Sequence, residues 1–224
     1  MCGRFALISW SALTEQFNLD DIDEAFKKAR YNIAPTQQIA IIANEETRQL
    51  TGAQWGLIPH WAKDKKMAAK MINARSETID EKPSYRTPFK KHRCLIPADA
   101  FYEWKGKGKN KEPQLIRLTG GKLFAFAGLY STWRSPDGTV VPSCTIITTE
   151  PNELVAKIHH RMPVILPKEA YDRWLEPGPG KDLKELLLPF PASEMETFPV
   201  STAVNNARND SEDCIKPFVQ GKLF

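Results

Sequence analysis

A largely apolar run occupies residues 94–104 and reads CLIPADAFYEW. A short apolar run that is rich in aromatic residues predicts a strand buried in the protein interior. The two runs that follow it, residues 114–121 (QLIRLTGG) and 122–133 (KLFAFAGLYSTW), meet at Gly120-Gly121. Because paired glycines are typical of tight hairpin turns, we expect these two runs to pair with each other as antiparallel strands.

The remaining elements extend the same pattern outward along the chain. Residues 39–44 (IAIIAN) and 49–58 (QLTGAQWGLI) flank a short polar turn and predict a second β-hairpin. Further strands are expected at 143–150 and 162–167, and short helices at 11–17 (with Ser11 as N-cap), 152–160, 167–175 and 181–188.

Expected strands outnumber expected helices, and 17 prolines divide the chain into short elements. The predicted fold class is therefore α+β, with a mainly antiparallel, barrel-like core and short flanking helices. We expect one domain over residues 1–224, because a chain of this length fits a single hydrophobic core.

The composition is that of a soluble globular protein, with 42% hydrophobic and 26% charged residues and a net charge of +4. This mildly basic balance permits an anionic partner. The four cysteines form no C-x-x-C pair and the four histidines form no H-E-x-x-H motif, so we expect no metal site. We expect no cofactor either, because the chemistry considered below acts on a carbonyl that is already electrophilic. No apolar run approaches the ~20 residues of a membrane span, and no signal peptide is apparent, which favours a cytoplasmic, reduced protein without membrane contact.

The N-terminus reads MCGRF and places a cysteine directly after the initiator methionine. We expect removal of Met1, after which Cys2 would carry a free α-amine and a thiol on adjacent carbons. Such a 1,2-aminothiol can capture an aldehyde as an imine and then close through sulfur to a thiazolidine ring. The alternative is that Cys2 has no chemical role.

Three other segments place ionisable or polar groups within an apolar frame. Asn73, Arg75 and Glu77 alternate, so in an extended segment they would share one face, although an ordinary polar edge is equally consistent with this pattern. Glu103 lies between aromatic residues, where partial desolvation would raise its pKa toward the range that suits general acid–base catalysis. His159 and His160 are adjacent, and histidine exchanges protons near neutral pH.

Several aromatic and basic residues could contact single-stranded nucleic acid. Trp55 and Trp61 flank a proline-containing loop, and Pro35 lies in a second apolar loop, so these side chains could stack on unpaired bases. Burial in the core is the alternative for each tryptophan. The cations that could neutralise phosphates are Lys63, Lys65, Lys66, Lys90, Lys91 and Arg93.

Seven segments in a fixed order resemble one known family over nearly the whole chain. They are MCGRF (1–5), YNIAP (31–35), WGLIP (55–59), INAR (72–75), CLIPADAFYEW (94–104), IHHRMP (158–163) and PVSTAVN (199–205). Together they resemble the SRAP family, the SOS response-associated peptidase-like proteins that sense abasic sites in single-stranded DNA.

The resemblance implies a function in DNA damage and repair and a role for particular residues. The α-amine of Cys2 would form a Schiff base with the abasic aldehyde and its thiol would close a thiazolidine, which gives a covalent DNA–protein crosslink that protects the lesion. Glu103 would transfer the proton of the amine, His159 would assist ring opening and the reverse reaction, and Asn73 would hold the N-terminal loop and the lesion. The implied DNA-binding residues are Arg4, Arg75, Pro35, Trp55 and Trp61.

The resemblance also implies a monomer that needs no obligate protein partner and associates with the nucleoid when it is bound to DNA. Two other functions remain open at this stage. One is a thiol peptidase that acts on its own N-terminus, although we expect no separate pro-segment before Cys2 and trimming of one methionine needs only an aminopeptidase. The other is a non-covalent single-strand DNA-binding module in which Cys2 is incidental.

Overall fold

The computed structural model describes residues 2–44, 47–106, 108, 111–176, 178 and 181–218. Its centre is a small barrel of five strands that pair in the order β10-β4-β3-β6-β9, with β9 pairing back to β10. These strands are β3 (Gln38–Asn44), β4 (Arg48–Trp55), β6 (Arg93–Ala98), β9 (Phe124–Arg134) and β10 (Val140–Thr149). All of these pairs are antiparallel except β4–β10, which is parallel.

Three short strands extend the barrel pairing. They are β5 (Asn73–Arg75) and β11 (Met162–Pro163), which both pair with β10, and β12 (Ile165–Leu166), which pairs with β9. The pairing of β4 with β10 ends at Trp55, opposite Cys144, and β5 then pairs with β10 from Asn73, opposite Ile146. Trp55 and Asn73 therefore lie at the same end of the barrel.

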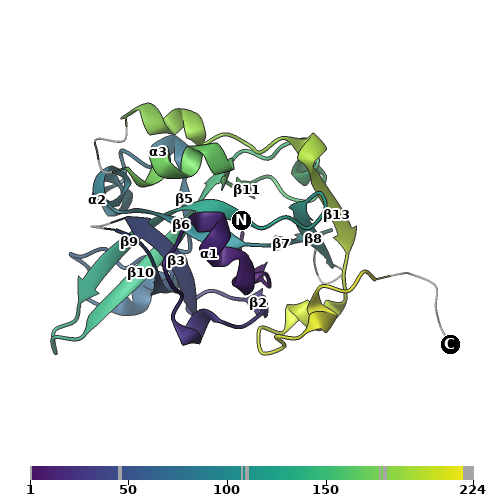
Figure 1. The fold of residues 1–224 in the computed structure, drawn as a ribbon, viewed down its shortest axis with the longest axis horizontal. Coiled ribbons are helices and arrows are strands. Elements are labelled where there is room, and N and C mark those ends of the chain that lie inside the picture. Colours follow the sequence, from purple (N-terminus) through teal and green to yellow (C-terminus); the bar gives the residue numbers. More distant parts are fainter. Residues whose placement is uncertain are drawn as a thin grey trace.

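A second, five-stranded antiparallel sheet lies beside the barrel in the order β13-β8-β7-β1-β2 (Figure 1). Its strands are β1 (Phe5–Leu7), β2 (Arg30–Ile33), β7 (Ala100–Lys105), β8 (Glu112–Leu118) and β13 (Met195–Pro199). Phe5 links the two sheets, because its ring packs edge-on against Trp55 at 5.2 Å and against Phe126 at 5.8 Å between ring centroids.

The α-helices are short and lie outside the sheets. They are α1 (Leu13–Phe17), α2 (Pro83–Lys91) and α3 (Tyr171–Leu175). Helices α2 and α3 pack on the β6–β9 side of the barrel, toward the upper left of Figure 1. The 3₁₀ segments are η1 (Trp10–Ala12), η2 (Glu24–Phe26), η3 (Lys65–Lys70), η4 (Ser76–Thr78), η5 (Val155–Lys157), η6 (Lys168–Ala170), η7 (Lys181–Leu186), η8 (Ala192–Glu194), η9 (Thr202–Asn205) and η10 (Glu212–Cys214).

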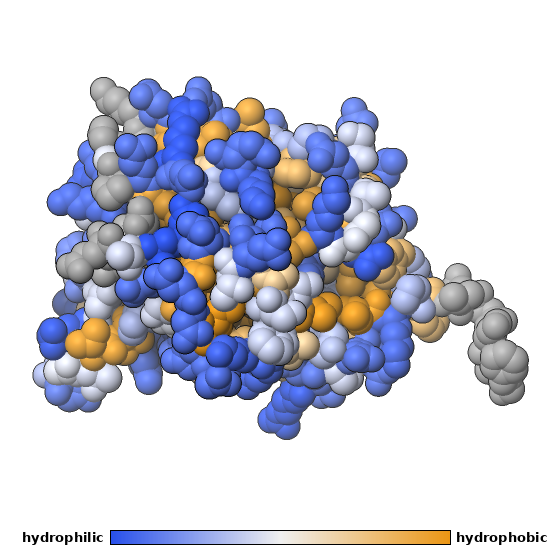
Figure 2. Space-filling view, viewed as in Figure 1, coloured by the Kyte–Doolittle hydropathy of each residue, from blue (hydrophilic) through white to orange (hydrophobic). Residues whose placement is uncertain are grey.

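The predicted α+β class with a mainly antiparallel, barrel-like core is confirmed. The predicted hairpin at residues 39–58 is also found, as the β3–β4 pair, although β4 ends at Trp55. Hydrophilic side chains cover most of the face drawn in Figure 2, and apolar ones show mainly in hollows between them. No helix within the described ranges is long and apolar enough to cross a membrane.

The single strand predicted for residues 94–104 is wrong, because the chain changes sheets at Asp99. β6 belongs to the barrel and β7 belongs to the second sheet. Asp99 is buried between them and accepts hydrogen bonds from the backbone N–H groups of Ile8 and Ser9 and from the Ser9 hydroxyl, at 2.5, 2.9 and 2.6 Å. A buried carboxylate needs such donors, and their position beside β1 accounts for the turn of the chain at this residue.

The hairpin predicted across Gly120-Gly121 is also wrong. Both glycines have positive φ angles, of 79° and 67°, so the turn itself is present. However, β8 pairs with β7 and β13, whereas β9 pairs with β6, β10 and β12. The turn therefore joins the two sheets instead of closing a hairpin.

Smaller differences concern the short elements. The expected strand at 162–167 is divided into β11 and β12, which pair with different neighbours. The helix expected at 152–160 is only the 3₁₀ segment η5, and 181–188 holds only the 3₁₀ segment η7. Ser11 lies inside η1 and caps no helix, because the residue before α1 is Ala12.

Candidate active site

Cys2 is brought to the end of β7 by the pairing of β1 with that strand. Phe5 is opposite Phe101, and the Tyr102 N–H donates to the Arg4 carbonyl at 2.9 Å, so the segment before β1 continues alongside Glu103. The Cys2 side chain is fully buried. Burial, reinforced by the negative charge of Glu103, raises the pKa of the Cys2 thiol well above its usual range, which keeps the sulfur protonated at neutral pH.

Glu103 is itself buried, with 4% of its surface exposed, although it lies near the end of a strand. Burial raises the pKa of the Glu103 carboxyl, because the charged form loses hydration. Its Oε1 lies 3.9 Å from Nδ1 of His159. Two residues that the sequence singled out separately, a desolvated carboxyl and an imidazole, therefore lie close together beside the Cys2 thiol.

His159 follows η5 and is held by the backbone of Arg161. His159 Nδ1 lies 3.0 Å from the Arg161 backbone nitrogen and 3.1 Å from the Arg161 carbonyl oxygen, so the backbone of Arg161 fixes the position of the imidazole ring. Burial lowers the pKa of His159, so its neutral form is favoured. His160 is exposed, and its ring is tilted by 30° relative to that of His159 with the ring centroids 4.3 Å apart. The pKa of His160 is lowered mainly by the charge of His159.

Asn73 and Arg75 share one face of β5, because Ala74 between them is buried. The Asn73 amide donates to the Ile72 carbonyl at 2.9 Å, whereas its buried Oδ1 accepts no hydrogen bond from any residue that the structure describes. Arg75 is exposed. The predicted alternation ends there, since Glu77 lies in η4 and not in a strand.

Arg161 is a site residue to which the sequence analysis gave no role. Its guanidinium contacts both carboxylate oxygens of Glu77 and donates to the Thr148 carbonyl at 2.6 Å. This pairing holds the pKa of Glu77 below its usual range. The Arg161 side chain thus connects the η4 segment to β10, and its backbone orients His159. The arginine in the IHHRMP segment was the sequence feature that could have indicated this role.

The predicted DNA-binding residues differ widely in exposure. Trp61 is 50% exposed and Arg75 is exposed, whereas Pro35 is half-buried in the loop between β2 and β3. Trp55 is fully buried and its indole N–H donates to the Ile72 carbonyl at 2.9 Å. The prediction that Trp55 stacks on a base is therefore corrected, because its ring lies in the core against Phe5.

Two predicted phosphate ligands are engaged inside the protein. The half-buried Arg4 guanidinium donates from Nη1 to the Asn32 side chain at 2.8 Å and to the Val204 carbonyl at 2.7 Å. Arg93 is buried and donates to the carbonyl groups of Phe89, Trp174 and Glu176, so its assignment as a phosphate ligand is wrong.

Among the residues that the structure describes, no three His, Cys, Asp or Glu side chains are placed to hold a metal ion together.

The fold and the site together define a class: small α+β barrel proteins in which a cysteine near the N-terminus lies beside a buried glutamate and a histidine. The family model described as SOS response associated peptidase (SRAP) matches residues 1–207. The chain belongs to this SRAP family.

Similar proteins are found in bacteria and vertebrates. The chain is 50% identical over 222 residues to the abasic site processing protein YoqW of Bacillus subtilis (strain 168), covering 96% of this chain and 99% of that protein. It is 36% identical over 203 residues to the abasic site processing protein HMCES of Gallus gallus, covering 80% of this chain and 60% of that protein. A crystal structure of a protein from Bacteroides thetaiotaomicron superposes with a TM-score of 0.87 at 28% identity, over 97% of this chain and 100% of that one.

Proposed function

We propose that this protein recognises abasic sites in single-stranded DNA and joins itself to them through Cys2. The support is its family membership, the similarity to proteins named for abasic site processing, and the arrangement of the site. The observation that carries the proposal is the buried Cys2 thiol beside the buried Glu103 carboxyl, which lies 3.9 Å from His159.

The proposed reaction begins with the chain whose first residue is Cys2. The α-amine nitrogen attacks C1′ of the ring-opened abasic deoxyribose, and the resulting carbinolamine loses water to leave an imine. The Cys2 sulfur then adds to the imine carbon and the thiol proton passes to the nitrogen, which closes a five-membered thiazolidine. The net reaction joins the two molecules with loss of one water and requires no oxidant, because the aldehyde carbon is already electrophilic.

The burial of Cys2 favours attack by the amine before the sulfur. A thiol with a raised pKa remains protonated and is a weak nucleophile until a neighbouring base removes its proton. We assign that transfer, and the earlier removal of a proton from the α-ammonium group, to Glu103. A carboxyl with a raised pKa both accepts and returns a proton near neutral pH, so the same group can protonate the departing hydroxyl of the carbinolamine.

We assign His159 to the opening of the deoxyribose ring and to the reverse reaction, because it lies 3.9 Å from Glu103 and its lowered pKa favours the neutral ring, which can accept a proton. The unsatisfied Oδ1 of Asn73 would accept a hydrogen bond from the lesion or from the N-terminal segment. Arg75 and Trp61 would contact the flanking phosphates and bases, with Pro35 as an apolar contact beside them.

Intact mass spectrometry tests this proposal. The protein is mixed with a single-stranded oligonucleotide that carries one abasic site, and an unmodified oligonucleotide is the control. We expect a heat-stable adduct at the sum of the two masses less one water, on protein lacking Met1, with peptide mapping to Cys2. Absence of an adduct from protein that lacks Met1 would contradict the proposal, and cleavage of a peptide substrate would favour the thiol peptidase instead.

A further inference from the structure

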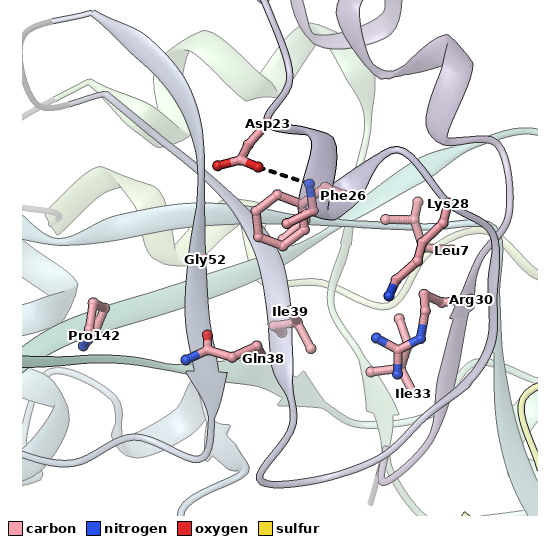
Figure 3. A pocket seen from close by; sticks show the side chains of 12 residues that line it. Leu7, Asp23, Phe26, Lys28, Arg30, Ile33, Gln38, Ile39, Gly52 and Pro142 are labelled. Carbon is pink, nitrogen blue, oxygen red and sulfur yellow. Dashed lines mark hydrogen bonds between the residues drawn. The ribbon is translucent and has the colours of Figure 1, made fainter. Parts of the chain in front are cut away.

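A cavity of about 510 Å³ lies between η2, β2 and the β3–β4 hairpin, away from the Cys2 site (Figure 3). Its floor is apolar and is formed by the buried side chains of Leu7, Ile33 and Ile39. An open cavity with an apolar floor can take the face of a flat ring.

An aromatic ring lies across one wall of this cavity. Phe26 packs over Gly52, where a methyl group added to the glycine would lie 3.1 Å from the ring carbon Cζ. The glycine therefore allows the ring to lie close to β4. Phe26 is only half-buried, which leaves part of its ring available to stack with a ligand.

The cavity has a positive end. Lys28 and Arg30 lie together there, with the Lys28 ammonium directed toward the Arg30 guanidinium in Figure 3. Arg30 is already paired with Asp210 at 2.5 Å, whereas Lys28 makes no ion pair with any residue in the described ranges. The one carboxylate lining the cavity, Asp23, accepts a hydrogen bond from the Ala25 N–H at 2.8 Å.

The cavity is near, along the chain, to Cys2 and to one of the proposed DNA contacts. The loop with Pro35 joins β2 to β3, and residues from both of these strands line the cavity. Leu7 on its floor is five residues from Cys2, which limits the separation of their Cα atoms to about 18 Å. If the abasic nucleotide of a DNA strand is bound at Cys2, a nucleotide only a few positions away on the same DNA strand could therefore reach this cavity.

We propose that this cavity binds one flanking nucleotide of the damaged single strand, with its base against Phe26 and its phosphate at Lys28. The inference rests on the proposed function, since it concerns the same DNA strand. Stacking on an aromatic ring together with a cation at the phosphate is the usual combination in proteins that bind single strands. The cavity would then fix the direction in which the strand crosses the protein.

Photo-crosslinking tests the position. Oligonucleotides carry one abasic site, which sets the register at Cys2, and one 5-iodouracil at a chosen distance on either side of it. We expect irradiation to attach the iodouracil to the peptide containing Phe26 at one spacing and on one side only. Attachment only to other peptides, at every spacing, would overturn the proposal.

Binding of a fluorescent oligonucleotide without an abasic site tests the energetics independently of the covalent reaction. We expect Phe26→Ala to weaken binding at least fivefold with an unchanged salt slope, and Lys28→Glu to weaken it by a similar factor with a shallower slope. Lys168→Glu is the matched control, because Lys168 is also exposed and lies in η6, which contributes no residue to the cavity.

Lys28→Glu and Lys168→Glu should unfold at the wild-type temperature because both lysines are exposed, whereas Phe26→Ala should unfold at a lower temperature because part of its ring packs against the core. Binding is therefore measured at a temperature at which thermal unfolding shows all of the variants to be folded. If the wild type forms the Cys2 adduct but both cavity variants bind like the wild type, the cavity proposal fails and the proposed function stands. If the wild type forms no adduct while the variants still weaken binding, the proposed function fails and the cavity remains a nucleotide site.

Discussion

At the scale of single residues, burial accounts for the direction of each pKa shift in the Cys2 site. Desolvation is the largest influence on Cys2, Glu103 and His159, and in each case it disfavours the charged form. The site therefore brings together a thiol and a carboxyl with raised pKa values and an imidazole with a lowered pKa, which suits sequential proton transfers.

Replacement of Glu103 with glutamine should raise the melting temperature while it slows the reaction with DNA. Because the folded-state pKa of Glu103 is raised, its contribution to stability is present below the unfolded pKa and is lost as pH rises through the folded pKa. We expect Glu103→Gln to melt at a higher temperature than the wild type at pH 7 to 8, by about 2–4 °C for each kcal/mol relieved, and the difference to vanish near pH 4. Calorimetry across this pH range measures it, and a lower melting temperature at pH 8 would contradict the assigned burial cost.

The same variant should form the DNA adduct more slowly, because glutamine transfers no proton. General acid–base groups contribute on the order of 10²–10⁴ in rate, so we expect a decrease of at least tenfold in single-turnover crosslinking. Binding to an oligonucleotide without a lesion serves as the control and should be unchanged.

The two adjacent histidines should differ in their effect on the reaction. His159 lies 3.9 Å from Glu103, whereas His160 is exposed. We expect His159→Ala to slow adduct formation or its reversal by at least tenfold, and His160→Ala to change either rate less than threefold. Single-turnover kinetics of both variants decide between them, and a larger effect at His160 would show that the wrong imidazole was assigned.

At the scale of elements, the segment of residues 200–210 supports the N-terminal strand from a distance in sequence. Asn32 on β2 is fully buried, accepts a hydrogen bond from Arg4, and donates to the carbonyl groups of Val204, Asn206 and Asn209 at 3.2, 3.1 and 2.6 Å. This one side chain therefore connects β2, the residue before β1 and the segment around η9.

Removal of that side chain should loosen both ends of the chain. Asn32→Ala removes all of these hydrogen bonds from a fully buried position, although Arg4 and the Val204 carbonyl still bond with each other, so we expect a loss of about 3 kcal/mol in unfolding free energy. Asn206→Ala is the control, because that side chain is exposed and should cost less than about 0.5 kcal/mol. Urea unfolding of both variants measures the difference, and equal midpoints would show that the network adds no stability.

At the scale of the whole molecule, the arrangement of cations matters more than the net charge of +4. Arg4, Arg93 and Arg161 bond with groups inside the protein. Arg75, in contrast, is exposed on the face of β5 that also carries Asn73. The cations that are free to meet an anionic partner are therefore a subset that composition alone does not identify.

The salt dependence of DNA binding should distinguish these two groups of arginines. We expect Arg75→Ala to weaken binding and to reduce the slope of log K against log salt by about 0.7, the value for one phosphate contact on a single strand. Arg4→Ala should instead lower the melting temperature, because its guanidinium bonds with Asn32 and Val204. Titrations at four salt concentrations measure the slopes, and an unchanged slope in Arg75→Ala would place the phosphates elsewhere.

Local sequence predicted most elements of this protein but not their partners. The hairpin of β3 and β4 followed from alternating apolar runs around a polar turn, and both glycines of the turn before β9 were identified. The strand at 94–104 was predicted as one element because its apolar run is continuous. Its division at Asp99 depends on donors from Ile8 and Ser9, which lie about ninety residues away in the sequence.

Sequence by itself determined the α+β class, the family, and the identity of the chemically capable residues Cys2, Glu103 and His159. The order of motifs and the chemistry of each side chain can be read directly from the amino-acid sequence. Only the tertiary structure decided which sheets the strands join, that Trp55 and Arg93 are buried, and that Arg161 orients the histidine. Burial and hydrogen bonding between distant segments arise from packing of the whole chain, and no short stretch of sequence specifies them.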